Sequence, residues 1–261
     1  MEKFQAGGLS CTLVLPQDYA ESSRRYPVLY INGGGQTEEV AAEVVKAGLR
    51  MDFLMLGIEP ASWNDDFTPW SAAPFRSGEA APEGRADDYL NRLTGQIKPD
   101  IDARYRTMPE PRNTALFGYS LGGLAALYAA YRTDLFGVVG SLSGSLWYDG
   151  FCDYMRQHTP RNPDLRIYLS LGEKEERSKN PRMAAVGECT RLAQEILRGQ
   201  LEESSAPTET EEGAASAQAG AGGAFAAGRP PRVSLEWNEG GHFHEVPRRF
   251  VRAIAWWRGL D

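Results

Sequence analysis

The sequence is poor in cysteine and histidine and has no long apolar run. Its 261 residues include 3 cysteines and 3 histidines. Cys11, Cys152 and Cys189 lie far apart in the chain and lack the spacing of metal ligands, so we expect reduced thiols in structural positions. No segment is apolar for the roughly 18 residues of a membrane span, and the start lacks the apolar stretch of a signal peptide. These absences predict a soluble, cytoplasmic protein with no membrane partner and no metal.

Positive charge is also in short supply. Lys and Arg together number 28 against 35 Asp and Glu, which gives a formal net charge of -7. Such a surface repels the phosphate backbone, so nucleic acid is not an expected partner, and an anionic membrane surface is disfavoured for the same reason. Hydrophobic residues make up 42% and charged residues 24% of the chain, an ordinary globular composition. The length suits a single α/β domain over residues 1–261.

Short apolar runs alternate with helical patterns along the chain. Strands are expected at 9–15, 26–31, 51–58, 114–117, 137–142, 165–171 and 232–237. Helices are expected at 38–47, 87–105 with a break near Pro99, 121–132, 181–201 and 247–258. This alternation predicts a mostly parallel sheet with helices on both faces, and ligand chemistry at the carboxyl ends of the strands.

Two segments interrupt the alternation. Residues 59–84 form a long loop that is rich in proline and aromatic side chains, and loops of this length in a compact domain are often functional. Residues 202–231 consist almost entirely of Ala, Gly, Ser, Thr, Glu and Pro. Because this composition buries too little apolar surface to offset its ordering entropy, we expect a disordered insertion between a helix and a strand.

The pattern G-x-S-x-G occurs at residues 118–122, with Ser120 at its centre. The pattern is weak by itself, but here it follows an apolar strand and opens a helix, which is the position of a nucleophile elbow. The elbow needs small residues two positions either side of the serine, because a strained turn lifts the hydroxyl above the sheet. Ser120 is therefore the candidate nucleophile. The alternative is a tight turn with a solvent-facing serine.

A serine hydroxyl needs a base, which is usually a histidine. His242 and His244 follow the last expected strand, where the chain order serine, acid, histidine places the base. His242 comes directly after two glycines that leave room for the ring to turn toward the serine. It is the preferred base, with His244 as the alternative, whereas His158 lies in a segment typical of exposed surface.

The acid of a triad would follow the preceding strand, where it holds the imidazole tautomer and stabilises the imidazolium. Glu173, Glu175 and Glu176 all come after the strand at 165–171. We favour Glu175, because the loop must turn before a side chain can point back at the histidine, and Glu173 is still leaving the strand. Glu173 remains an alternative, as does a dyad of serine and histidine without an acid.

An oxyanion hole needs two backbone N–H donors. We expect one from Leu121, the residue after the nucleophile, and one from Gly34 in the glycine loop at 33–35. The alternative for that loop is a flexible turn. A phosphate-binding loop is disfavoured, because no lysine follows in the P-loop pattern.

Five segments together resemble a known family. They are Tyr30-Ile-Asn-Gly-Gly-Gly35, Asp66-Phe-Thr-Pro69, Ile101-Asp-Ala-Arg-Tyr-Arg-Thr107, Gly118-Tyr-Ser-Leu-Gly-Gly123 and Gly240-Gly-His242. The chain resembles, outside 202–231, the esterase family of esterase D (S-formylglutathione hydrolase), enterochelin-type siderophore esterases and feruloyl esterase domains. The resemblance implies an α/β-hydrolase fold, carboxylic ester hydrolysis without a cofactor, and catalytic roles for Ser120 and His242. The family often has Asp where this chain has Asn32 and Glu175.

The substrate of such an enzyme would be a small-molecule ester. Trp63, Trp70, Phe75 and Trp147 are candidates to stack on a planar acyl group such as a catecholate or hydroxycinnamate, and Arg76 to meet an anionic substrate. Core packing is the alternative for each aromatic side chain. The resemblance favours the siderophore-esterase branch. Thioester hydrolysis or acyl transfer would use the same site, and a non-catalytic binding module is the alternative from another class.

Overall fold

Eight strands form one sheet in the order β1-β2-β4-β3-β5-β6-β7-β8, in a computed structural model that describes residues 1–203 and 231–259. The strands are β1 (Glu2–Ala6), β2 (Leu9–Val14), β3 (Val28–Asn32), β4 (Leu54–Ile58), β5 (Thr114–Tyr119), β6 (Val138–Leu142), β7 (Arg166–Gly172) and β8 (Val233–Asn238). β1 and β2 form an antiparallel hairpin, and β2 is antiparallel to β4. From β4 to β8 every neighbouring pair is parallel.

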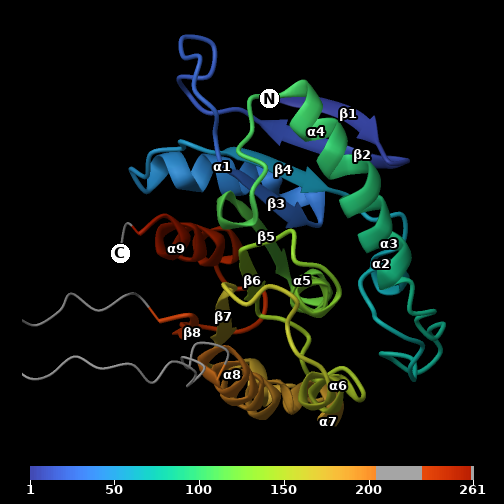
Figure 1. Cartoon of the computed structure of the whole chain (residues 1–261). Helices are drawn as coiled ribbons and strands as arrows, with labels where there is room; N and C mark the ends of the chain where they lie inside the picture. The colour runs from blue at the N-terminus through green and yellow to red at the C-terminus, as the bar shows by residue number, and fades with distance from the viewer. Residues whose placement is uncertain (204–230, 260–261) are drawn as a thin grey trace, which may run out of the picture.

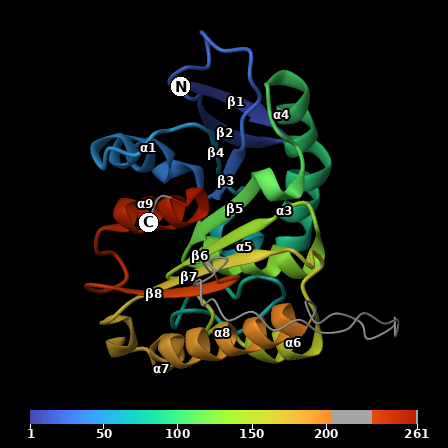
Figure 2. The same ribbon diagram turned by 60° about the vertical axis from the view of Figure 1, so that its left-hand side comes forward.

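Helices cover both faces of the sheet (Figure 1). On one face lie α1 (Thr37–Lys46) and α9 (Val246–Arg258), side by side in both views (Figure 2). The other face is covered by α3 (Ala86–Arg92), α4 (Lys98–Arg104), α5 (Leu121–Arg132), α6 (Phe151–Gln157) and α8 (Val186–Glu203). The buried apolar side chains accordingly form two clusters, one under each layer of helices. The central strands are buried along their whole length, which explains their continuous apolar runs.

The parallel strands bring distant parts of the chain to one edge of the sheet. In register, Asn32 of β3 pairs with Gly118 of β5, and Tyr119 pairs with Leu142 of β6. Further along, Gly172 of β7 pairs with Asn238 of β8. The loops that follow β3, β5, β7 and β8 carry the glycine turn, the serine elbow, the glutamates and the two histidines, respectively. The candidate residues therefore lie together at the carboxyl ends of the strands, where ligand chemistry was expected.

Several elements differ from the expectation. The edge strand β1 was not predicted, because its polar sequence EKFQA is mostly exposed and has no apolar run. The helix expected at 87–105 is interrupted before Pro99 by a π-helical turn of residues 93–97. Pro99 itself lies in the first turn of α4, where the missing N–H of proline is tolerated. The helix expected at 181–201 is divided into α7 (Pro181–Ala184) and α8.

The long loop at 59–84 contains the short helix α2 (Trp63–Asp66). Cys152 and Cys189, far apart in sequence, are neighbours: the Cys152 sulfur lies 3.9 Å from the carbonyl oxygen of Cys189. All three cysteines are free thiols, as expected. The prediction of an insertion at 202–231 falls, apart from its ends, on residues 204–230, which lie outside the described ranges.

Candidate active site

Ser120 stands on a strained turn between β5 and α5. Its φ angle is 58°, a backbone conformation that residues other than glycine rarely adopt. The turn is tight because Gly118 and Gly122 have no side chains: a Cβ on Gly118 would lie 2.1 Å from the carbonyl oxygen of Gly122. Neighbouring loops hold the serine backbone, since its N–H donates to Leu142 (3.0 Å) and its carbonyl accepts from the Ser145 N–H (3.0 Å). The local geometry is that of a nucleophile elbow.

His242 lies in the loop after β8 and faces the serine. Its Nε2 is 3.1 Å from Ser120 Oγ, and its Nδ1 is 2.7 Å from Glu175 Oε2. Because a carboxylate only accepts hydrogen bonds, the network assigns the proton to Nδ1 and leaves Nε2 as the acceptor for the serine hydroxyl. The Tyr119 hydroxyl donates to the backbone carbonyl of His242, which fixes the loop as well as the ring.

Glu175 is buried at the start of the 3-10 turn after β7, with 8% of its surface exposed. Its Oε1 accepts three hydrogen bonds: from the Gly172 N–H (2.8 Å), Ser143 Oγ (2.7 Å) and Arg249 Nη1 (2.8 Å). Burial alone raises the pKa of this carboxyl, but the hydrogen bonds from His242, Ser143 and Arg249 outweigh it and lower the pKa to about 2. Glu175 is therefore ionised at neutral pH.

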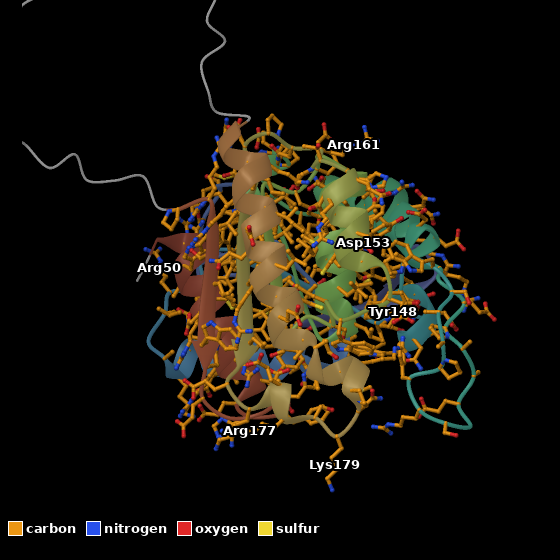
Figure 3. All side chains as sticks on the ribbon, turned by 90° about the horizontal axis from the view of Figure 1, so that it is seen from below. Arg50, Tyr148, Asp153, Arg161, Arg177 and Lys179 are labelled. Carbon is orange, nitrogen blue, oxygen red and sulfur yellow. The ribbon has the colours of Figure 1, made fainter. Side chains whose placement is uncertain are left out.

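The alternatives considered for acid and base lie away from the serine. Glu173 is exposed, and Glu176 forms a two-pronged ion pair with Arg191 (3.1 Å for each pair of atoms). The turn that sends Glu175 inward sends Arg177 and Lys179 outward at the rim of the protein (Figure 3). His244 is exposed, and His158 stacks on Tyr154 of α6. Of all the residues considered as nucleophile, base or acid, the structure brings together Ser120, His242 and Glu175.

The two residues predicted to donate to an oxyanion each begin a helical turn. Leu121 is the first residue of α5, and Gly34 is the first residue of the 3-10 turn Gly34–Gln36. The first N–H groups of a helix have no partner within that helix, so both are suited to an external acceptor. The turns start from adjacent strands, and the Asn32 side chain links them through a 3.0 Å hydrogen bond to the Gly122 carbonyl. The oxyanion role of both residues stays a prediction.

A cavity of about 320 Å³ opens beside the serine. Besides the three residues above, it is lined by Arg76, Ser143, Ser145, Trp147, Ser178, Met183, Val186 and Phe243. Phe243, directly after the histidine, is 87% exposed at its mouth. The lining combines an apolar wall with hydroxyl groups near the serine and one arginine at the edge. Such a cavity accepts a small ligand with an apolar body.

Two of the five predicted substrate-binding residues line the cavity in the structure, and three do not. Trp147 and Arg76 line the cavity, whereas Trp63, Trp70 and Phe75 do not. Trp70 packs among the rings of α5 and α6 and donates from Nε1 to the Asp149 carbonyl (2.8 Å). Phe75 is buried edge-on against Trp147, with 5.6 Å between ring centroids.

Trp63 lies over the glycine turn, where a Cβ on Gly33 would come within 2.8 Å of its ring. Because Trp70 and Phe75 pack against other rings and do not line the cavity, core packing, the alternative interpretation, describes these two residues.

Sequence reasoning missed the residues that support the acid. Arg249, Ser143 and Tyr119 contact Glu175 or one another. Arg249 and Ser143 carry no motif, and Tyr119 occupies a variable position of the G-x-S-x-G pattern. Arg249 belongs to an amphipathic helix, and its helical spacing from Phe250, Ala253 and Trp257 places it on the buried face, a signal that could have found it. Met183, Val186 and Phe243 of the cavity were also missed, since apolar residues in helices and loops are usually packing residues.

Two expected absences concern metals and membranes. Among the residues described, no cluster of three or more His, Cys, Asp or Glu side chains is placed to hold a metal ion. In residues 1–203 and 231–259, no helix combines the length and apolar character that crossing a membrane requires.

A sheet that is parallel from β4 to β8, with a serine elbow after β5 and a histidine after β8, defines an α/β-hydrolase. Solved structures agree on the fold. The enterobactin esterase FES from Shigella flexneri superposes with a TM-score of 0.67 at 15% identity, over 97% of this chain and 56% of that one. The family model described as "Putative esterase" matches residues 9–209. The chain belongs to this family and is a carboxylic ester hydrolase, which confirms the expected fold and class of enzyme.

Relatives in sequence include proteins with and without an assigned activity. The uncharacterized protein YbbA of Bacillus subtilis (strain 168) is 29% identical over 184 residues, which are 69% of this chain and 74% of YbbA. An endo-1,4-beta-xylanase/feruloyl esterase of Xylanibacter ruminicola is 30% identical over 181 residues, 64% of this chain. The match spans only 23% of the length of that larger enzyme.

Proposed function

We propose that Ser120, His242 and Glu175 form a catalytic triad that hydrolyses carboxylic esters through an acyl-enzyme. One observation carries the proposal: an unbroken line of hydrogen bonds, 3.1 Å from Ser120 to His242 and 2.7 Å from His242 to Glu175, whose serine end opens into the cavity. A buried, ionised carboxylate behind the imidazole is the arrangement that makes a serine hydroxyl nucleophilic.

The acylation step follows from this geometry. Ser120 Oγ attacks the ester carbonyl carbon while His242 Nε2 takes the hydroxyl proton, and Glu175 stabilises the imidazolium that forms. The carbonyl oxygen becomes an oxyanion that accepts hydrogen bonds from the N–H groups of Leu121 and Gly34. When the tetrahedral intermediate collapses, the alcohol leaves with the proton from Nε2. The acyl group then remains on the serine.

Deacylation repeats these steps with water in place of the serine. His242 takes a proton from the water, the hydroxide attacks the acyl carbon, and the carboxylic acid leaves as the proton returns to Ser120. Each proton passes through Nε2 alone, since Nδ1 stays bonded to Glu175. The reaction needs no cofactor.

The cavity favours an ester with a planar aromatic acyl group. Trp147 provides a ring wall, Met183 and Val186 complete an apolar lining, and Arg76 at the edge suits an anionic or phenolic group. Enterobactin and feruloyl esterases among the similar proteins support siderophore or hydroxycinnamoyl esters.

The test replaces the serine and compares acyl groups. Ser120→Ala should lower kcat for any accepted ester by at least about a thousandfold with an unchanged fold, because the nucleophile is lost. Ser23→Ala, at an exposed serine far from the site, is the matched control and should keep wild-type activity. A fluorophosphonate probe should label wild type and Ser23→Ala but not Ser120→Ala.

Steady-state kinetics on feruloyl, benzoyl and acetyl esters and on a formyl thioester should rank the aromatic esters highest in kcat/KM. More than about a hundredth of wild-type turnover in Ser120→Ala would contradict the mechanism. A preference for the formyl thioester would contradict the substrate class.

A further inference from the structure

Arg249 is a charged side chain buried behind the triad. It belongs to the first turns of α9 and is 1% exposed. Burying a guanidinium is costly unless it is paired and hydrogen-bonded, so its partners show what it serves. Nη1 donates to Glu175 Oε1 (2.8 Å), to Ser143 Oγ and to the Tyr119 hydroxyl (3.1 Å). Nη2 donates to the Gly241 carbonyl (2.7 Å).

These contacts reach both the acid and the loop that carries the base. Through Oε1, Arg249 fixes the Glu175 carboxylate so that Oε2 faces the imidazole. The Gly241 carbonyl, one residue before the base, accepts directly from Nη2. The Tyr119 hydroxyl accepts from Arg249 and donates to the carbonyl of His242. The guanidinium therefore restrains the imidazole ring of His242 through the Glu175 carboxylate. It restrains the His242 backbone through the Gly241 carbonyl and the Tyr119 hydroxyl.

The charge of Arg249 matters as well as its shape. Arg249 from α9, His242 from the loop after β8 and Tyr119 from β5 are titratable or charged groups that face the Glu175 carboxylate, and Arg76 lines the same cavity. A cation at 2.8 Å partly neutralises the carboxylate and so weakens its attraction for an imidazolium. Removing the cation would also leave the buried carboxylate with one fewer compensating charge.

We propose that Arg249 is a positioning residue of the esterase: its buried guanidinium holds the acid and the base loop in register. The inference rests on the proposed triad. Arg249 does not line the cavity, so it acts on the reaction through Glu175, Tyr119 and Gly241 and not through substrate.

The experiment compares three variants in α9. Arg249→Met should lower kcat on the best ester by about a hundredfold with KM within about twofold, because a small misplacement of catalytic groups costs that much and substrate contacts are intact. Arg249→Lys keeps the charge but not the planar guanidinium, so its kcat should lie between those of Arg249→Met and wild type. Arg248→Met, on the exposed neighbour, is the matched control.

A double variant tests whether Arg249 acts through the acid. In a Glu175→Gln background, Arg249→Met should cost about tenfold further in kcat, less than the hundredfold expected in wild type, because only the contacts to Tyr119 and Gly241 are left to lose. The double variant should also melt at a higher temperature than Arg249→Met alone, because it leaves no uncompensated buried charge.

A folded Arg249→Met with wild-type kcat would overturn the inference. The inference would also be overturned if Arg249→Met lowered kcat by a further hundredfold in the Glu175→Gln background. If wild type hydrolyses no ester, the proposed function fails, while the melting temperatures still test the pairing of Arg249 with Glu175.

Discussion

The three glutamates after β7 differ in burial and in hydrogen-bond partners, although they lie within four residues of one another. Glu175 begins a 3-10 turn that sends its side chain inward, whereas Glu173 stays exposed and Glu176 pairs with Arg191. The sequence could narrow the acid to three residues, and the need for a turn pointed to the one that faces His242. It could not predict the donors to Oε1, because Ser143 and Arg249 lie far away in the chain and reach the carboxylate only in the fold.

Replacing each glutamate separately tests the acid. Glu175→Gln should lower kcat on the best ester by about a hundredfold to ten-thousandfold, because the amide cannot stabilise the imidazolium and permits the wrong tautomer. Glu173→Gln and Glu176→Gln should stay within about twofold of wild type, and they serve as matched controls. Steady-state kinetics at saturating ester decide the matter. Equal activity of all three variants would mean that a dyad of Ser120 and His242 suffices.

Among the elements, the end of β7 is tightly constrained by the groups that surround it. A Cβ on Gly172 would lie 2.6 Å from the Gly240 carbonyl oxygen, 2.7 Å from Arg249 Nη2 and 3.0 Å from Glu175 Oε1. Its N–H also donates to that same Oε1. The strand must therefore end in glycine for the acid, the guanidinium and the histidine loop to meet.

Gly172→Ala tests this close approach. The methyl group should push apart backbone and charged side chains, lowering the melting temperature by several degrees and kcat by about a hundredfold or more. Gly199→Ala is the matched control: Gly199 is an exposed helical residue of α8 with nothing within 4 Å of an added Cβ, and alanine there should stabilise by about 0.5–1 kcal/mol. Thermal unfolding followed by circular dichroism, with kinetics at 25 °C, measures both. A Gly172→Ala protein as active and stable as wild type would contradict the packing.

Elements were predictable where burial leaves a simple pattern. β3, β4 and β5 lie under helices on both faces, so their apolar runs are continuous and were found. β1 was missed because an edge strand can be polar. The roles of the loop aromatics could not be separated in advance: Trp147 lines the cavity and Phe75 packs behind it, although both are aromatic side chains near proline- or glycine-rich turns.

For the molecule as a whole, the ionisation of Glu175 links the active site to acid stability. Its pKa falls from 4.5 to about 2 on folding, so the folded form binds a proton less readily than the unfolded chain. The resulting stabilisation is fully present above about pH 5 and is lost as the pH falls toward 2. Its size is on the order of 3 kcal/mol in the free energy of unfolding.

Urea unfolding between pH 2 and pH 7 measures this contribution. Wild type should exceed Glu175→Gln in the free energy of unfolding by a margin that shrinks steadily below pH 5, since acid converts the wild-type carboxylate to a neutral group. The margin over Glu173→Gln should stay flat, because that side chain is exposed. A pH-independent margin for Glu175→Gln would mean that its carboxylate is not the source of the acid sensitivity.

The position of Arg249 in α9 also bears on how the enzyme comes into being. A chain leaving the ribosome presents the serine elbow after β5 and the acid after β7 well before it presents the base. Until α9 docks beside α1, the Glu175 carboxylate has no guanidinium partner and the Gly241 carbonyl lacks its donor. We therefore expect the proposed triad to reach its final geometry only when this helix is in place.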